Sequence, residues 1–357
     1  MTNRLQEPAA PPPWGARGDP FTLAHLSDLH ATDVRIASPR DVLSKRALGW
    51  LSWRRKRRKE HRREVLEALV DDLRACAPDH VGVTGDLTHL GLPDEIAEAV
   101  AWLERLGPAE RVAVVPGNHD AYAGAEGAER WAPWRAYLGD DGAAAAVGAA
   151  ASGSTSANGR SDAPHDDPAT RGFPWVRRIG ARAALIGVSS ARPTAPLLAT
   201  GRVGEAQRTR LERLLRTLAD EGRVRIVLMH HPPLPAGQSR RRQLDDAAAL
   251  RALLARVGAE LVLHGHTHES HVDELPGPHG AIPVIGVPSS SSIGHRPARR
   301  ARYHLYRIEP WADAGGVPRC RLSWQVRGFD PASGRFRAEA ECETAPPAPA
   351  AAAAPRR

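Results

Sequence analysis

Five short groups of polar residues in this chain combine side chains that can hold metal ions. The groups are Asp28-Leu29-His30, Gly85-Asp86, Gly117-Asn118-His119-Asp120, His230-His231 and Gly265-His266-Thr267-His268. Carboxylate, amide and imidazole are the ligands suited to Mn, Fe or Zn, whereas Mg and Ca would be served by oxygen alone. The glycines that precede Asp86, Asn118 and His266 permit tight turns and a close approach of the backbone to a ligand. The residue types therefore predict metal-dependent chemistry.

Each group directly follows an apolar or β-branched run that predicts a strand. These runs are Phe21–Ser27, His80–Thr84, Arg111–Val115, Val224–Met229 and Leu261–His264. Because the carboxyl ends of the strands form the binding crevice in open α/β sheets, we expect the five groups to converge in space.

Further strands and interleaved helices predict an α/β fold, in which the later strands are free to form a second sheet. The other predicted strands are Trp175–Ile179, Ala183–Val188, Ile282–Val287, Tyr303–Ile308 and Arg321–Val326. The predicted helices are Arg62–Cys76, Asp94–Leu106, Glu126–Leu138, Glu205–Leu218 and Asp245–Val257.

Composition divides the chain into one catalytic domain and several low-complexity segments. We expect the domain over residues 20–330, after a disordered segment at 1–19 and before an Ala/Pro-rich disordered tail at 331–357. Within the domain we expect a low-complexity insert at about 140–172, either a lid or plain disorder, and a basic amphipathic insert at about 42–63.

Overall composition excludes several classes of protein. The 357 residues are 42% apolar and 25% charged, which excludes a collagen-like or wholly disordered chain. No run of about 18 apolar residues predicts a transmembrane helix, and the first residues lack the apolar stretch of a signal peptide. Three scattered cysteines, Cys76, Cys320 and Cys342, fit a reducing compartment without a disulfide framework. We therefore expect a cytoplasmic enzyme.

The five polar groups, in this order and each after an apolar strand, resemble the signature blocks of the calcineurin-like metallophosphoesterase superfamily over roughly residues 21 to 308. The resemblance implies a four-layer α/β/β/α sandwich of mixed sheets flanked by helices. It also implies two divalent metal ions, Mn, Fe or Zn, that share Asp86 as a bridging ligand. The other implied ligands are Asp28, His30 and His268 at the first site and Asn118, His230 and His266 at the second.

The implied reaction is hydrolysis of a phosphodiester or pyrophosphate bond by attack of a metal-bridging hydroxide, because two metals lower the pKa of a shared water to ~7 or below. In the family pattern His119 is not a ligand. It would point at the substrate and steady developing charge or protonate the leaving oxygen. Asp120 could orient His119 or merely close a turn.

Other polar residues near these groups have a structural and a functional interpretation. We expect His231 to face away behind His230 and His264 to be a hydrogen-bonded structural residue. His89 could line the mouth of the site or cap a loop. Ser289–Ser292, with His295 and Arg296, could touch a second phosphate or form an ordinary loop.

Residues 45–63 concentrate the positive charge of the chain. They hold ten Lys and Arg residues and one acid, Glu60, so this segment carries +9 and the rest of the chain −1. Leu43, Ala47, Trp50 and Leu51 fall on one side of a helical wheel, with Trp53 beside them. Such a pattern is typical of an interfacial amphipathic helix, and each basic residue near an anionic membrane is worth ~1 kcal/mol. The alternatives are a solvated helix packed on the core, and nucleic acid, which the lack of interspersed aromatic residues disfavours.

The segment Lys45-Arg46, Gly49-Trp50 and Trp53, placed just after the first metal block, resembles the branch that includes the UDP-diacylglucosamine pyrophosphatases. This shorter resemblance implies a lipid-linked nucleotide substrate at the inner face of a membrane. A cyclic-nucleotide phosphodiesterase, whose metal blocks look the same, is the alternative. A nuclease is disfavoured. A non-catalytic binding scaffold is also disfavoured, because loss of activity should have erased metal ligands and none of the implied ligands is missing.

Overall fold

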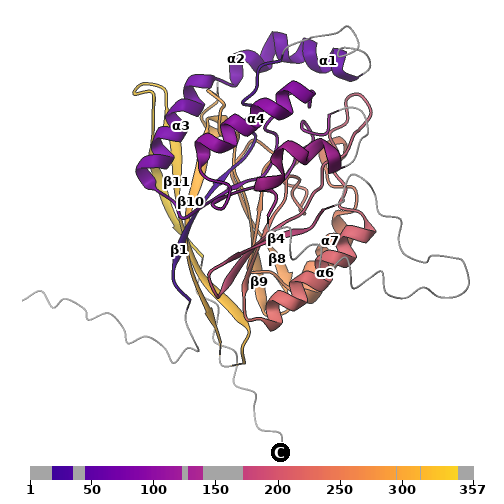
Figure 1. The fold of residues 1–357 in the computed structure, drawn as a ribbon, viewed down its shortest axis with the longest axis vertical. Helices are drawn as coiled ribbons and strands as arrows, with labels where there is room; N and C mark the ends of the chain where they lie inside the picture. Colours follow the sequence, from indigo (N-terminus) through magenta and orange to yellow (C-terminus); the bar gives the residue numbers. More distant parts are fainter. Residues whose placement is uncertain are drawn as a thin grey trace, which may run out of the picture.

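The computed structural model describes residues 18–34, 45–122, 128–139, 172–294, 296–313 and 315–344, which fold around two mixed β-sheets (Figure 1). The strand order is β12-β11-β10-β1-β2-β3 in the first sheet and β4-β5-β6-β7-β9-β8 in the second. The first sheet contains β1 (Phe21–Leu26), β2 (His80–Val83), β3 (Val112–Val114), β10 (Arg302–Ala312), β11 (Pro318–Asp330) and β12 (Arg335–Glu343). The second contains β4 (Trp175–Ile179), β5 (Ala183–Gly187), β6 (Val224–Leu228), β7 (Leu261–His264), β8 (His271–Gly277) and β9 (Gly280–Gly286).

Parallel strands form one side of the first sheet and the centre of the second. β1, β2 and β3 are parallel, whereas β10, β11 and β12 continue that sheet as antiparallel strands. β5, β6, β7 and β9 are parallel, with antiparallel β4 and β8 at the two edges. The carboxyl ends of the parallel strands in each sheet therefore point to one edge, as the position of the polar groups requires.

Helices cover the two sheets, and alternate side chains of the second sheet face different layers. Ile226 and Leu228 of β6 belong to the core that includes Leu23 of the first sheet. Val227, between them, belongs to a separate core with α6 (Glu205–Asp220) and α7 (Ala247–Val257). On the first sheet α3 (Arg63–Cys76) packs against β11 and β12, and α4 (Pro93–Leu106) lies beside it (Figure 1). This arrangement confirms the predicted four-layer α/β/β/α class.

The segment predicted as a helix at Glu126–Leu138 differs from the structure in its geometry. Its described part, Ala128–Tyr137, is a 3₁₀ helix that contains Pro133. Because proline has no N–H to donate, it cannot continue the regular hydrogen bonding of an α-helix.

Two strands escaped the sequence prediction. β8 carries Pro276 and exposed charges at the edge of its sheet, where a strand can tolerate both. β12 lies inside 331–357, so a disordered tail was wrong for this part, and the folded domain extends past residue 330 to Glu343. Only alternate residues such as Phe336 face the core, and the charges between them made the strand resemble a tail. Residues 345–357, 1–17 and 140–171 lie outside the described residues.

The basic insert forms a continuous helical segment at the top of Figure 1, with α1 (Lys45–Ser52), a π-helical turn η2 (Trp53–Arg57) and α2 (Arg58–Glu60). Trp50 and Trp53 pack against a small apolar cluster of Val34, Leu90 and Leu92. A Cβ at Gly49 would lie 2.5 Å from the Tyr122 hydroxyl, so only glycine lets the helix approach this closely. Of the predicted apolar side, Trp50 packs on the protein itself together with the neighbouring Trp53, whereas Ala47 and Leu51 are exposed and Leu43 lies outside the described residues.

A carboxylate on α3 fastens this helix to the first sheet. Asp72 accepts a hydrogen bond of 2.6 Å from the Tyr303 hydroxyl of β10. It also accepts bonds of 2.6 and 2.7 Å from Nε and Nη2 of Arg327 on β11, and both charged side chains are mostly buried.

We expect Asp72→Ala to lower the free energy of unfolding by about 2–3 kcal/mol, because it removes the anionic partner of a mostly buried guanidinium and the shortest hydrogen bond of the Tyr303 hydroxyl. Urea denaturation measures the change. Asp71→Ala is the matched control, since Asp71 only makes an exposed contact of 3.7 Å with Arg74, and it should cost less than about 0.5 kcal/mol. Equal losses in the two variants would contradict the assignment.

A buried histidine on β10 predicts that acid destabilises the fold. Burial, with a smaller contribution from Arg302, lowers the pKa of His304 to about 3. An unfolded histidine titrates near ~6.5, so between about pH 6 and 4 only the unfolded chain binds this proton. Stability therefore falls as the pH falls through this range.

We expect His304→Gln to reduce the slope of unfolding free energy against pH, between pH 6 and 4, by about 1.4 kcal/mol per pH unit. Urea denaturation at several pH values measures the slope, with His279→Gln at an exposed position as the control. An unchanged slope in His304→Gln would rule out this contribution.

Candidate metal centre

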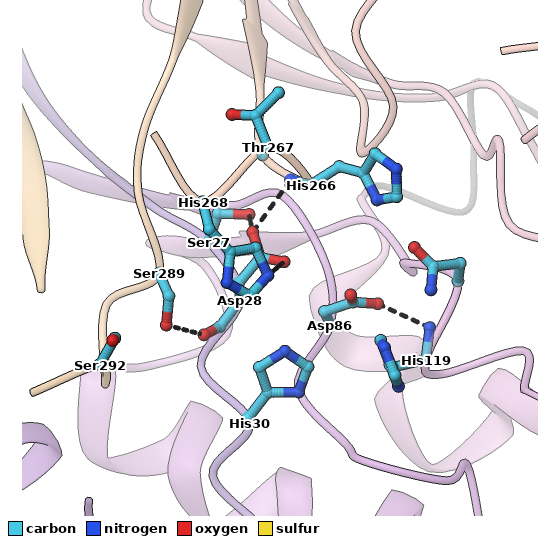
Figure 2. A network of polar contacts seen from close by, with 12 residues as sticks. Ser27, Asp28, His30, Asp86, His119, His266, Thr267, His268, Ser289 and Ser292 are labelled. Atoms are coloured by element: carbon cyan, nitrogen blue, oxygen red, sulfur yellow. Dashed lines mark hydrogen bonds and ion pairs between the residues drawn. The ribbon is translucent and has the colours of Figure 1, made fainter. Parts of the chain in front are cut away.

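The structure places the predicted site residues in loops after five strands and gathers them at one place. Asp28 and His30 follow β1, Asp86 follows β2, and Asn118 and His119 follow β3. His230 follows β6, and His266 and His268 follow β7. Figure 2 shows the side chains of Asp28, His30, Asp86, His119, His266 and His268 around a common space. All of the candidate ligands are buried except His268, whose side chain is 24% exposed.

Backbone strain marks the same residues. Eight non-glycine residues of the described ranges have a positive φ, and five of them are candidate ligands: Asp28, His30, Asp86, His266 and His268. Such left-handed conformations cost energy and gather at functional sites. This signal is independent of the residue types on which the sequence argument rests.

The ligand atoms form adjoining groups of metal-binding size. Those of Asp28, His30 and His268 lie within 4.8 Å of one another, as do those of Asp28, Asp86 and His230. His230 Nε2 also lies 3.1 Å from Asn118 Oδ1 and 3.4 Å from Asp86 Oδ2. A third group joins His230 and His266 with His231. Asp86 thus lies between the groups, where the family pattern expects a shared ligand.

The donor set fits cations because three imidazoles are oriented by backbone carbonyls. His30 Nδ1 donates to the Thr88 carbonyl at 2.9 Å, His230 Nδ1 to that of Thr84 at 2.7 Å, and His266 Nε2 to that of Arg242 at 2.8 Å. Each ring then keeps its other nitrogen as a lone-pair donor, as in metal sites generally. Oδ1 of Asp28, which is buried, faces Nε2 of His268 at 3.0 Å.

Electrostatics favour the protonation states that ligands need. Burial holds the pKa values of His30 and His266 well below the usual range, so both rings are neutral. Burial opposes ionisation of Asp28, but the facing His268 holds its pKa well below normal. Burial likewise opposes a charge on His230, yet Asp86 raises its pKa to about 9. A cation at this position would have to displace that proton.

Asp120 organises the loops around Asp86. Its carboxylate accepts hydrogen bonds of 2.8–2.9 Å from the backbone N–H groups of Asp86, Gly117 and Thr88 and from the Thr88 hydroxyl. Asp86 Oδ1 in turn accepts 2.7 Å from the backbone N–H of His119 (Figure 2). Of the two roles considered for Asp120, the structure favours the turn.

The His89 carbonyl and an arginine of the basic insert fix His119. His119 Nδ1 lies 2.6 Å from the His89 carbonyl oxygen, which can only accept, so Nδ1 carries the proton. Nε2 accepts from Arg57 Nη1 at 2.7 Å, and the same Nη1 lies 3.0 Å from Nδ1. Sequence reasoning missed Arg57, because nothing distinguishes it from its basic neighbours.

The remaining neighbours mostly support the ligands. His231 is engaged by Ser190 Oγ at 2.8 Å and the Ala199 carbonyl at 3.2 Å. Its ring lies 4.3 Å from that of His266 between centroids, so His231 does not face away from the site as expected. The ring of His89 stacks on that of His30, with centroids 5.1 Å apart. His61, a residue that sequence reasoning did not single out, lies 4.4 Å from His30 by the same measure.

The serine loop supports the backbone and the insert. Ser289 Oγ donates to the Asp28 carbonyl at 2.7 Å, and Ser291 Oγ lies 2.8 Å from His61 Nδ1. Arg296 is exposed, and His295 lies outside the described residues. His264 is buried and Nδ1 contacts the Gly265 carbonyl at 3.1 Å, as expected of a structural residue.

A cavity of about 300 Å³ opens onto the centre. Its walls include Asp86, Asn118, His119, His266 and His268, with Arg57 and Arg242 on the polar side. Tyr122, Leu197 and Leu198 add an apolar wall. The cavity has room for a phosphoryl group and part of the group attached to it.

Fold and site together define a hydrolase of phosphate esters. The chain belongs to the calcineurin-like phosphoesterase family, whose sequence model matches residues 21–270. A search of curated proteins found no match.

Solved structures share the fold at low sequence identity. A dimetal phosphatase from Danio rerio is 14% identical, with a TM-score of 0.52 over 90% of this chain and 99% of that one. A purple acid phosphatase from yellow lupin (Lupinus luteus) seeds is 12% identical, with a TM-score of 0.49 over 91% of this chain and 54% of that one.

Proposed function

We propose that the protein is a dinuclear metal-dependent phosphoesterase that hydrolyses a phosphodiester or pyrophosphate bond. The observation that carries the proposal is a chain of adjoining ligand groups in one buried pocket, which are linked through Asp28 and His230 and of which the middle one contains Asp86. Asp28, His30 and His268 would hold one cation, and Asn118, His230 and His266 the other, with Asp86 shared. The dimetal phosphatase from Danio rerio has the same overall fold.

When bound, two such cations activate a water molecule at neutral pH and clamp the phosphoryl oxygens for in-line displacement. The protein residues then determine the net charge of the pocket and the position of the substrate. Asn118 offers a neutral oxygen, so the pocket stays net positive and attracts a phosphate. His119 lies in the wall with Nε2 as an acceptor, so it can protonate a leaving oxygen only after Arg57 has moved away and Nε2 has gained a proton. Until then, Arg57 provides the positive charge at this wall.

We expect Asp86→Asn to lower the manganese content from about two ions per chain to one or fewer, because it removes the shared anion. Turnover of bis-p-nitrophenyl phosphate with added Mn²⁺ should fall by about 1,000-fold or more. Elemental analysis and initial rates measure the two effects.

Asp94→Asn is the control, since Asp94 is an exposed carboxylate in the first turn of α4. A wild-type protein that binds fewer than about one Mn²⁺ per chain, or an Asp86→Asn protein as active as wild type, would refute the proposal.

Within this function, we propose a lipid-linked nucleotide pyrophosphate as the substrate, with a cyclic nucleotide as the alternative. The outer side of the basic insert supports an anionic membrane surface as partner, at the inner face of the membrane. Its exposed residues are Leu51, Arg54, Arg55, Arg58, Lys59 and Arg62. Among the described residues, no helix could span a bilayer. Parallel rates on a cyclic nucleotide and a lipid-linked sugar nucleotide decide between the substrates.

We expect a variant with Arg54, Arg55, Arg58, Lys59 and Arg62 changed to Gln to bind anionic vesicles at least about tenfold more weakly, since each of these exposed residues contributes ~1 kcal/mol near such a surface. Co-sedimentation measures the bound fraction. The control is Arg335→Gln with Arg337→Gln, two exposed arginines on β12. Equal binding by wild type and the five-residue variant would end the membrane proposal.

A further inference from the structure

The basic insert does more than carry charge on its surface, because one of its arginines enters the cavity at the metal centre. Arg57 ends the π-helical turn η2, and its Nη1 reaches His119. The neighbouring Arg54, Arg55 and Arg58 remain exposed. In a π turn each hydrogen bond joins residues five positions apart, one more than in an α-helix. The side chain of Arg57 therefore leaves the helix in a different direction from those of its neighbours.

The guanidinium of Arg57 lacks an anionic partner among the described residues. Its only hydrogen bonds are to the uncharged ring of His119. Asp86 and Glu60 attract it from beyond contact distance, while burial and Arg242 disfavour its charge and lower its pKa. Two cations bound to Asp86 would cancel its attraction for Arg57, which is the larger of the two. A desolvated guanidinium in such a place is stabilised when an anion binds to it.

A second arginine lines the same cavity, and its charge acts on Arg57. Arg242 lines it beside His266, whose ring is held by the Arg242 backbone carbonyl. Both arginines border the cavity that also contains Asp86 and Asn118, at which a scissile phosphoryl group would sit. Arginine presents planar pairs of donors that match phosphate oxygens, so two arginines beside the metals suit an additional phosphoryl group.

We propose that Arg57 and Arg242 form an anion subsite that holds a second phosphoryl group next to the scissile one. This inference rests on the proposed function and narrows its substrate class to pyrophosphates, in preference to simple phosphodiesters and cyclic nucleotides, which carry one phosphate. Binding of the second phosphoryl group draws Arg57 from His119 Nε2. The basic insert is thereby a specificity element of the active site as well as a charged surface.

Isothermal titration calorimetry of the manganese-loaded protein tests the subsite without turnover. The probes are methylenediphosphonate, a non-hydrolysable pyrophosphate analogue, and inorganic phosphate. We expect Arg57→Gln to weaken the binding of methylenediphosphonate by about 10- to 100-fold and that of phosphate by less than about threefold. Only methylenediphosphonate reaches both the position of the scissile phosphoryl group and the anion subsite. Arg57→Lys keeps the charge and should recover part of the loss. Arg55→Gln, at an exposed position of the same insert, should match wild type.

Equal weakening of both probes by Arg57→Gln, no weakening of methylenediphosphonate, or the same weakening by Arg55→Gln would overturn the inference. Manganese content and thermal midpoint equal to wild type show that each variant is folded and loaded. In kinetics, Arg57→Gln should lower kcat/KM for a nucleoside diphosphate sugar by about tenfold more than for bis-p-nitrophenyl phosphate. A wild-type protein that hydrolyses neither compound would refute the proposed function, while the calorimetry would still decide the subsite.

Discussion

One buried carboxylate, that of Asp120, holds together the loops on which the rest of the site depends. It accepts hydrogen bonds from both sides of Asp86 and from Gly117, so the ends of β2 and β3 are locked to each other. Burial, and then the neighbouring Asp86, raises the pKa of Asp120 to about 7. The ionised form that accepts these bonds therefore needs positive charge nearby. The two proposed cations would supply it, so metal binding and the local fold stabilise each other.

The sequence predicted the fold class and the convergence of the ligand loops, because both depend on local pattern. Apolar runs that end in Asp28, Asp86 or His230 place these residues at strand ends, and parallel strands bring such ends together. Arg57 could not be found in this way, since its contact with His119 spans 62 positions. A helical wheel also assumes a period of 3.6, which the π turn breaks. β12 was missed because its inward residues are few and its charged residues dominate the composition.

The basic insert shows how one short helical segment can serve two surfaces. Its inner side packs Trp50 and Trp53 onto the apolar cluster and sends Arg57 to the cavity. His61, near the end of this segment, lies against His30 and contacts Ser291. Its outer side is almost entirely basic. Because the same segment touches the ligand shell and faces solvent, a partner on the outer side acts within one helix diameter of the chemistry.

The residues with left-handed backbone conformations at the metal centre lower the stability of the fold, yet they include the candidate metal ligands. Five candidate ligands adopt a conformation that costs on the order of 1–3 kcal/mol each. The surrounding core must outweigh this cost, and evolution cannot relieve it at Asp28, Asp86 or His266 by exchange for glycine without losing a ligand. Substitutions that raise heat resistance would therefore have to lie at positions other than these candidate ligands.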